Sequence, residues 1–252
     1  MSQTSGKQWH VPGGSPPPIA GGISAFLPCH NEEGNVERVV RAVVSTLEGL
    51  GVPFEVIVVD DGSTDRTAEL SRRLAQQDPR VRLTSHPRNL GYGAALRTGF
   101  AASRYPWIFF TDGDGQFDPR DLLRLLPHAA SADLVVGYRL RRRDPPHRRL
   151  FGWLWNLLVR AWFGLRVRDV DCAFKLLRKE VVEDLPLRAT GAFLSTELLC
   201  RAAARGARVV EVGVPHYPRR WGRQSGGRLD VVARAFVELW RLRRELRAGA
   251  QR

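Results

Sequence analysis

The chain has 252 residues, of which 43% are hydrophobic, and this is enough for one large α/β domain that needs no disulfides to complete its core. Its 39 lysines and arginines outnumber its 26 acidic residues and give a formal charge of +13, which favours an anionic partner such as nucleic acid, a membrane surface or a phosphorylated small molecule. Cys29, Cys172 and Cys200 are far apart, form no CxxC pair and are odd in number, which argues against a disulfide framework and a zinc site and favours a reducing, cytosolic setting.

The first 20 residues predict a disordered tail, because they are polar, rich in Pro, Gly and Ser, and lack the order of a signal peptide. No uninterrupted apolar run reaches the ~20 residues of a membrane-spanning helix. We therefore expect a tail over residues 1–20, one α/β domain over residues 21–226 and a basic amphipathic helix over residues 227–252.

Strands and helices alternate through the first half of the domain. The predicted strands cover residues 22–28, 54–61, 81–87 and 106–111. Asn31 is the expected cap of the first helix, with Glu32 and Glu33 in its first turn, and Ser63 or Thr64 is the expected cap of the second. The third strand leads into a Gly-rich turn and a third helix.

The second half continues the alternation. A strand is expected over residues 132–139, and a helix over residues 195–206 with Ser195 as its cap and Gly206 as its stop. A further strand is expected over residues 207–214. Alternation at this spacing predicts a mostly parallel sheet with helices on both faces.

Polar side chains follow four of the predicted strands at the point where each strand ends. They belong to residues 28–32, 60–61, 89–93 and 112–116. In open sheets of this class, ligands bind beyond the carboxyl ends of the strands. The sequence therefore predicts a ligand site at this edge.

The acidic cluster TDGDGQ is the most specific of these features. Asp112, Asp114 and Gln116 alternate behind an apolar strand, and the intervening glycines let the backbone turn closely around a ligand. Hard oxygen donors suit Mg²⁺ or Mn²⁺, which take one or two protein carboxylates and complete their shell with phosphate oxygens and water. A metal–diphosphate site fits this pattern, whereas Asp118 is predicted to be only a helix cap.

Two further clusters are less specific when taken singly. Asp60 and Asp61 could form only a turn and a cap, but beside a metal site their carboxylates would face the polar edges of a base and a ribose. Gly91 and Gly93 could either let a helix pack closely on the sheet or line the ligand site, and the sequence leaves both interpretations open.

Five motifs occur in order along the chain: LPCHNEEGNV, VIVVDDGSTD, RNLGYGAALRTGF, TDGDGQFDP and DCAFKLLRKEV. Together they resemble the family-2 glycosyltransferases of GT-A fold, in particular the dolichyl- and polyprenyl-phosphate sugar synthases, such as dolichyl-phosphate mannose synthase. The resemblance extends from roughly Ile23 to Gly226. It implies a Rossmann-like, mostly parallel sheet with helices on both faces.

The resemblance also implies roles for single residues. The nucleotide of the sugar donor would be held by Pro28, His30, Glu32, Asp60, Asp61, Gly91 and Asp112. The metal would be held by Asp114 and Gln116, aided by Asp112. The acceptor phosphate would be held by Arg139 and Arg148, with Arg219 and Arg220 as alternatives. Asp112, Asp114 and Arg139 would thus act directly in catalysis.

The sequence departs from the family pattern at two places. Tyr92 stands where relatives often carry Lys, and Ala173–Phe174 stands where Gly–Phe is usual. The QxxRW motif of processive polysaccharide synthases does not occur. We therefore expect transfer of a single sugar rather than polymerisation. The resemblance implies that this transfer is inverting and metal-dependent and runs from a nucleotide sugar to a polyprenyl phosphate.

Residues 150–165 predict a helix with an unusual distribution of side chains. A narrow polar stripe is formed by Gly152, Asn156, Arg160 and Gly164, and apolar residues, three of them Trp, fill the rest. This composition favours a helix in a lipid interface over residues 149–166, although a helix buried under the sheet is the alternative. Together with the basic C-terminal helix, this segment predicts a cytoplasmic enzyme that binds peripherally to the inner face of an anionic membrane. A small membrane protein is a further candidate partner.

Four other functions are alternatives to this one. A hydroxyl acceptor would require a general base, for which Asp171 and Glu197 are the candidates, whereas an ionised phosphate acceptor requires none. A nucleic-acid-binding protein fits the charge but not the convergent acids, so no nucleic-acid partner is expected. A nucleotidyltransferase would carry a basic, Gly-rich loop after the first strand, and a silent scaffold would not keep the metal motif.

Overall fold

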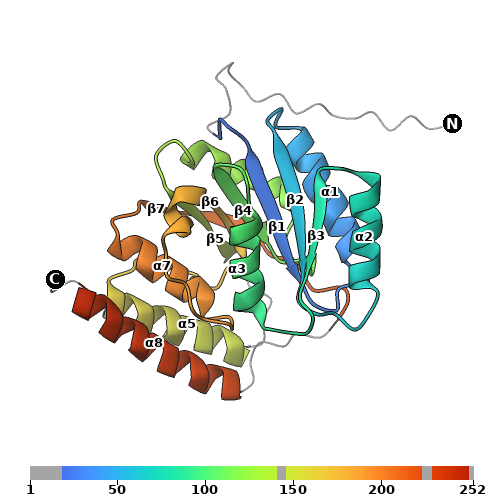
Figure 1. Cartoon of the computed structure of the whole chain (residues 1–252). Coiled ribbons are helices and arrows are strands. Elements are labelled where there is room, and N and C mark those ends of the chain that lie inside the picture. The colour runs from blue at the N-terminus through green and yellow to red at the C-terminus, as the bar shows by residue number, and fades with distance from the viewer. Residues whose placement is uncertain (1–18, 141–145, 223–228, 250–252) are drawn as a thin grey trace.

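The computed structural model describes residues 19–140, 146–222 and 229–249, and its centre is a seven-stranded sheet between helices (Figure 1). The strands are β1 (Ile23–Cys29), β2 (Phe54–Asp60), β3 (Val81–Ser85), β4 (Trp107–Thr111), β5 (Leu134–Leu140), β6 (Phe174–Arg178) and β7 (Val209–Pro215). β1, β2 and β4 are buried along their whole length, as expected for near-continuous apolar strands covered on both faces.

The strand order is β3-β2-β1-β4-β6-β5-β7. β6 runs antiparallel to β4 and to β5, and the remaining neighbours pair in parallel. The predicted mostly parallel α/β fold is therefore confirmed. The sequence did not predict β6, which inserts between β4 and β5.

Helices cover both faces of the sheet. On one face lie α1 (Val36–Glu48), α2 (Thr67–Gln77) and the short α4 (Leu122–Leu125), with the 3₁₀ turns η1 (Pro119–Asp121) and η2 (Leu126–His128). On the other lie α3 (Tyr92–Ala102), α6 (Lys179–Glu183) and α7 (Leu194–Ala204). Outside α7, α5 (Pro146–Phe163) and α8 (Leu229–Gly249) lie side by side (Figure 1).

Three predicted helix caps were wrong. α1 begins five residues after Asn31. The backbone N–H of Asn31 donates to Ser63 Oγ at 2.9 Å, and its side-chain Oδ1 accepts from Thr64 N at 2.8 Å. These tertiary bonds tie the loops after β1 and β2 together and so replace the expected capping of α1 and α2. Ser195 is the second residue of α7 and is buried, and Phe193 occupies the capping position.

The folded part begins slightly earlier than the expected boundary at residue 20. Ile19 is fully buried and packs in the core beneath α1. The rest of the expected tail, residues 1–18, lies outside the described residues. The division at residues 226 and 227 falls in a segment, 223–228, that is also outside them, and α8 begins at Leu229.

α5 and α8 are each buried on one side only. Val159 of α5 and Leu239 and Leu242 of α8 are in the core, and Trp155 packs edge-on against Phe236 at 5.6 Å between ring centroids. Their outer sides expose Leu150, Trp153, Leu154, Leu157, Phe236, Val237 and Trp240. We call these seven residues the apolar stripe. Within the described residues, no helix is long and apolar enough to cross a membrane.

Candidate active site

The turn after β4 brings the acidic motif against the end of β1. Gly113 N donates to Pro28 O at 3.3 Å, and a Cβ at Gly113 would overlap the Cys29 sulfur. Gly115 has a φ of +71°, which favours glycine. The two glycines therefore allow the close turn that the sequence predicted.

Asp112 lies at this turn with Tyr92 of α3. The Tyr92 hydroxyl donates to Asp112 Oδ1 at 2.8 Å. Burial, and then the nearby charge of Asp114, raise the pKa of Asp112 to about 7. Two desolvated carboxylates that repel each other form a site whose energy a cation would lower.

Asp114 is buried and is held in place by the turn. Its Oδ1 accepts the backbone N–H of Gln116 at 2.9 Å, and its Oδ2 accepts Arg219 Nη1 at 3.2 Å. Burial raises the pKa of Asp114, and the bond from Gln116 and the charge of Arg219 oppose that rise. Arg219 therefore supplies positive charge at the predicted metal ligand.

Glu32 is the second carboxylate that Arg219 contacts. Arg219 Nη2 donates to Glu32 Oε1, and Asn35 Nδ2 donates to Glu32 Oε2 at 2.8 Å. Burial raises the pKa of Glu32, against the hydrogen bond from Asn35. Arg219 thus bridges the loop after β1 and the turn after β4.

The segment after β7 carries Arg219 over the site. Tyr217 N donates to Gln116 O at 2.9 Å, and Gln116 Nε2 donates to Tyr217 O at 3.1 Å. Trp221 lies so close to Gly34 that a Cβ there would be 2.8 Å from the indole ring. Gln116, predicted to serve the metal, is therefore also the anchor of this segment.

The bridge gives a prediction for Arg219→Met, which keeps the apolar stem and removes the charge. The variant should bind Mn²⁺ without nucleotide about tenfold more tightly, because Glu32 and Asp114 lose a competing cation. Isothermal titration with MnCl₂ measures this. Arg220→Met, which removes an exposed arginine next in the chain, is the control and should behave like wild type. Unchanged or weaker Mn²⁺ binding in Arg219→Met would contradict the bridge.

Asp60 and Asp61 differ in their surroundings. Asp60 ends β2 and its Oδ1 accepts Ser63 N at 3.2 Å. Both oxygens of Asp61 are used by the chain itself, because Oδ1 accepts Leu90 N and Oδ2 accepts Gly91 N, at 2.8 and 2.9 Å. Asp61 therefore fixes the Gly-rich loop, and Asp60 is the member of the pair with more free acceptor capacity within the described residues.

His30 and the Gly-rich loop complete this edge of the sheet. His30 is exposed, and its Nδ1 lies 2.9 Å from Asp61 O. A Cβ at Gly91 or Gly93 would lie 2.5 or 2.7 Å from the backbone oxygen of Thr190 or Ala189. Both glycines therefore allow close approach to residues 189–191 rather than to the sheet, and their contact with a ligand stays a prediction.

Arg139, the predicted acceptor ligand, is paired. Its Nε and Nη2 donate to Asp169 at 2.6 and 2.8 Å, and within the described residues its Nη1 makes no hydrogen bond. Burial and the charge of Asp114 raise the pKa of Asp112, and Tyr92, Lys175 and then Arg139 lower it, so the charge of Arg139 acts on Asp112. Arg220 is exposed, and the side chain of Arg148 lies outside what the structure describes.

The two candidate bases have unlike surroundings. Glu197 is buried and accepts Arg188 N, Ala189 N and Arg201 Nε at 2.8 to 2.9 Å, so it is committed to holding α7 and the segment before it. Asp171 is exposed and its charge acts on Arg139. Of the two residues, Asp171 is exposed and Glu197 is buried.

Sequence reasoning missed the contributions of Tyr92 and Lys175. Tyr92 was noticed only as a departure from the family pattern. Lys175 on β6 is fully buried and its Nζ donates to Val170 O at 3.2 Å and to Cys172 O, which fixes the turn that carries Asp171. The available signal was a single lysine between apolar residues, in a strand that the sequence did not predict.

The described residues contain no group of three or more His, Cys, Asp or Glu side chains that could enclose a metal. Asp112 and Asp114 nevertheless fit Mg²⁺ or Mn²⁺, because such ions need only one or two protein carboxylates when phosphate oxygens complete the shell. Burial raises the pKa of both carboxyl groups, and a divalent cation would favour their charged forms. The donor set is thus that of a site completed by a substrate.

A mostly parallel sheet with acidic residues at the carboxyl ends of β1, β2 and β4 defines a GT-A-type glycosyltransferase domain. Residues 24–186 match the model of the family described as "Glycosyl transferase family 2". The chain belongs to this family, and the predicted enzyme class is confirmed.

Two curated relatives illustrate the match. The chain is 34% identical over 220 residues to "Glycosyltransferase AglD" of Haloferax volcanii, covering 83% of this chain and 34% of the relative. It is 34% identical over 217 residues to "Undecaprenyl-phosphate 4-deoxy-4-formamido-L-arabinose transferase" of Pseudomonas paraeruginosa, covering 85% of this chain and 63% of that protein. The chain therefore spans between about a third and two thirds of the length of these relatives.

Solved structures support the fold. Glucosyl-3-phosphoglycerate synthase of Mycobacterium tuberculosis, in complex with Mn²⁺, uridine diphosphate and glucosyl-3-phosphoglycerate, superposes with a TM-score of 0.65 at 24% identity, over 95% of this chain and 84% of that one. Another crystal structure of the same enzyme gives a TM-score of 0.63 at 26% identity, over 84% and 80% of the two chains. The GT-A fold is thus confirmed on structure as well as sequence.

Proposed function

We propose that this protein transfers one sugar from a nucleoside-diphosphate sugar to a polyprenyl phosphate. The observation that carries the proposal is the pair Asp112 and Asp114, two desolvated carboxylates at the ligand edge of the sheet. They stand beside an exposed His30 and the partly free Asp60, which suit the polar edges of a nucleoside. Carboxylates in this arrangement favour a substrate that brings phosphates together with a divalent cation.

The acceptor is inferred from the relatives. Undecaprenyl-phosphate transferases of several bacteria match this chain at 28–34% identity over most of its length. Arg139 is the candidate contact, because its Nη1 is unused within the described residues while Asp169 fixes the rest of the guanidinium. A planar, pre-oriented guanidinium suits a phosphate group.

The transfer we propose is a direct displacement. An oxygen of the acceptor phosphate forms a bond to the anomeric carbon while the bond to the leaving diphosphate breaks on the opposite face, and the configuration inverts. The acceptor oxygen is already ionised at neutral pH, since the second pKa of a phosphate monoester is about 6. Asp112 and Asp114 would hold Mg²⁺ or Mn²⁺, which would offset the charge developing on the nucleoside diphosphate.

A screen of donors and acceptors tests the proposal. Thermal shifts with UDP-, GDP- and dTDP-sugars, with and without Mn²⁺, identify the donor, because a ligand of the folded state raises its melting temperature. The selected donor is then incubated with undecaprenyl phosphate and, separately, with undecaprenol. We expect a glycosylated lipid phosphate and no product from the alcohol. A product only from hydroxyl acceptors would favour Asp171 as a base and overturn the proposed acceptor.

Arg139→Ala should reduce kcat/KM for the lipid phosphate about 10- to 100-fold, because a hydrogen bond to a charged group is lost. The Kd of the donor should change by less than about twofold, since the proposed contact of Arg139 is with the acceptor and Asp169 already holds its Nε and Nη2. Steady-state kinetics and titration calorimetry measure the two effects. An equal loss of donor affinity would instead assign Arg139 to the diphosphate.

A further inference from the structure

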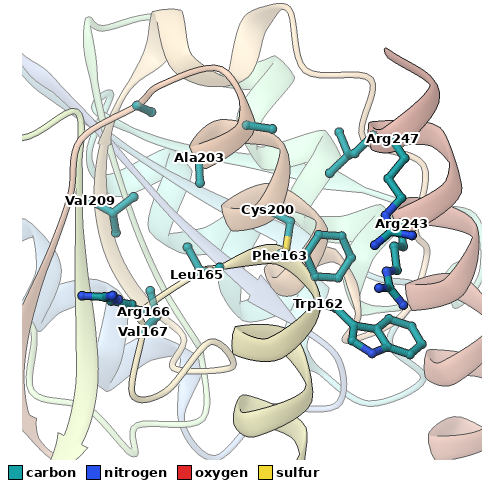
Figure 2. A pocket seen from close by; sticks show the side chains of 14 residues that line it. Trp162, Phe163, Leu165, Arg166, Val167, Cys200, Ala203, Val209, Arg243 and Arg247 are labelled. Carbon is teal, nitrogen blue, oxygen red and sulfur yellow. The ribbon is translucent and has the colours of Figure 1, made fainter. Parts of the chain in front are cut away.

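A groove lies between α7 and the last turns of α8 and reaches Val209 at the start of β7, remote in sequence from the acidic motif. It is formed by the end of α5, by α7 and by the last turns of α8, and has a volume of about 520 Å³ (Figure 2). Sites for small organic ligands typically measure about 300–1,000 Å³. Its walls include Trp162, Phe163, Leu165, Val167 and Val209, none of which was assigned to sugar transfer.

Arginines stand on both sides of this apolar groove. Arg243 and Arg247 of α8 lie together on one side, and Arg166 lies across from them (Figure 2). Within the described residues none of the three makes an ion pair with a carboxylate. Glu245, the acid between Arg243 and Arg247 in sequence, pairs instead with Arg201 and Arg188.

Within the part of the chain that the structure describes, no carboxylate pairs with Arg243 or Arg247. They are four residues apart on a helix, a spacing at which like charges repel. The guanidinium of Arg243 is stacked on Trp162 at 4.6 Å, and its Nε is buried without a hydrogen-bond partner in the described structure. A bound anion would relieve the repulsion and could accept a hydrogen bond from the buried Nε of Arg243.

The groove continues the apolar stripe. Arg243 and Arg247 follow Trp240 by three and seven residues and so share its side of α8. Trp240 is 50% exposed, and Trp153 of α5 is 60% exposed. A ligand in the groove would therefore meet an apolar surface at one end and two guanidinium groups at its side.

We propose that this groove binds an anionic phospholipid of the membrane, with the phosphate at Arg243 and Arg247 and an acyl chain against the apolar walls. Charge complementarity selects an anionic headgroup, and the apolar lining selects an amphiphile over a free ion. This site is distinct from the proposed acceptor contact at Arg139, and it would bind a phosphodiester lipid that is not consumed.

The test titrates dihexanoyl phosphatidylglycerol, kept below its micelle concentration, into the whole chain and measures binding by calorimetry. We expect saturable binding, with much weaker binding of dihexanoyl phosphatidylcholine and of inorganic phosphate. Arg243→Ala/Arg247→Ala should weaken it about tenfold or more, because hydrogen bonds to a charged group are lost. Arg247→Ala alone removes an exposed side chain and should weaken it in the same direction without affecting the fold.

Two control variants separate the outcomes. Arg72→Ala/Arg73→Ala removes the same charge from exposed positions of α2, and Arg139→Ala removes the proposed acceptor contact. Both should bind the lipid like wild type. Equal binding of phosphatidylcholine, equal loss in the α2 variant, or loss in Arg139→Ala would each overturn the site. Since no sugar donor is present, these results leave the proposed transfer reaction unaffected.

Discussion

Asp114→Asn should lower kcat for sugar transfer by about 10²–10³-fold, the usual cost of removing one preorganised group that offsets charge in a transition state. The asparagine keeps the oxygen that accepts Gln116 N, so the turn after β4 should persist. It removes the charge that would hold the divalent cation. Steady-state turnover with the donor selected by thermal shift measures the effect.

The same variant should lose the Mn²⁺-dependent part of nucleotide affinity, measured by calorimetry with and without the metal. Its melting temperature should change little, because loss of the Arg219 contact is offset by relief of repulsion with Asp112. Asp118→Asn is the matched control. Asp118 lies four residues further on, caps the 3₁₀ turn η1 through Arg120 N and pairs with the Arg120 side chain, so transfer should be retained. Turnover near the wild-type rate in Asp114→Asn would remove the basis for the metal site.

The sheet was predictable because β1, β2 and β4 are near-continuous apolar runs bounded by turn residues. β6 was not, because its sequence FKLLR places a lysine among apolar residues and reads as neither an alternating nor a fully apolar strand. Lys175 is tolerated in the core because Val170 O and Cys172 O accept its hydrogens and the Phe110 ring lies 5.4 Å away. Such compensation depends on tertiary contacts that sequence periodicity does not contain.

The site residues were predictable in type and position, but their partners were not. The motif after β4 indicated Asp112 and Asp114, and the close turn is as the glycines suggested. Arg219 lies 105 residues beyond Asp114, and nothing local to RRWG indicates that its guanidinium meets that carboxylate. Likewise, Asp61 looked equivalent to Asp60 in sequence, and only the folded loop after β3 shows that its oxygens are already used.

Trp153→Glu/Trp240→Glu should abolish flotation of the protein with anionic vesicles. A polyprenyl acceptor stays in the bilayer, so the proposed reaction requires the ligand edge to approach a membrane surface. The apolar stripe offers two tryptophans that are at least half exposed, and such rings suit the headgroup region. Burial of one such side chain contributes about 1.5–3 kcal/mol, so the two substitutions should weaken binding by at least about 100-fold.

Trp162 is left unchanged in this experiment, because it is only partly exposed and stacks under Arg243. Leu123→Glu is the matched control, since Leu123 is also exposed, at 40%, but lies on α4, on the opposite face of the sheet. Wild-type binding should strengthen with the fraction of phosphatidylglycerol and weaken as salt rises, because arginines of α8 contribute attraction that ions screen. If the wild type stays unbound at low salt, or the double variant floats equally well, the stripe contacts protein rather than lipid, and a membrane partner must bring the enzyme to its acceptor.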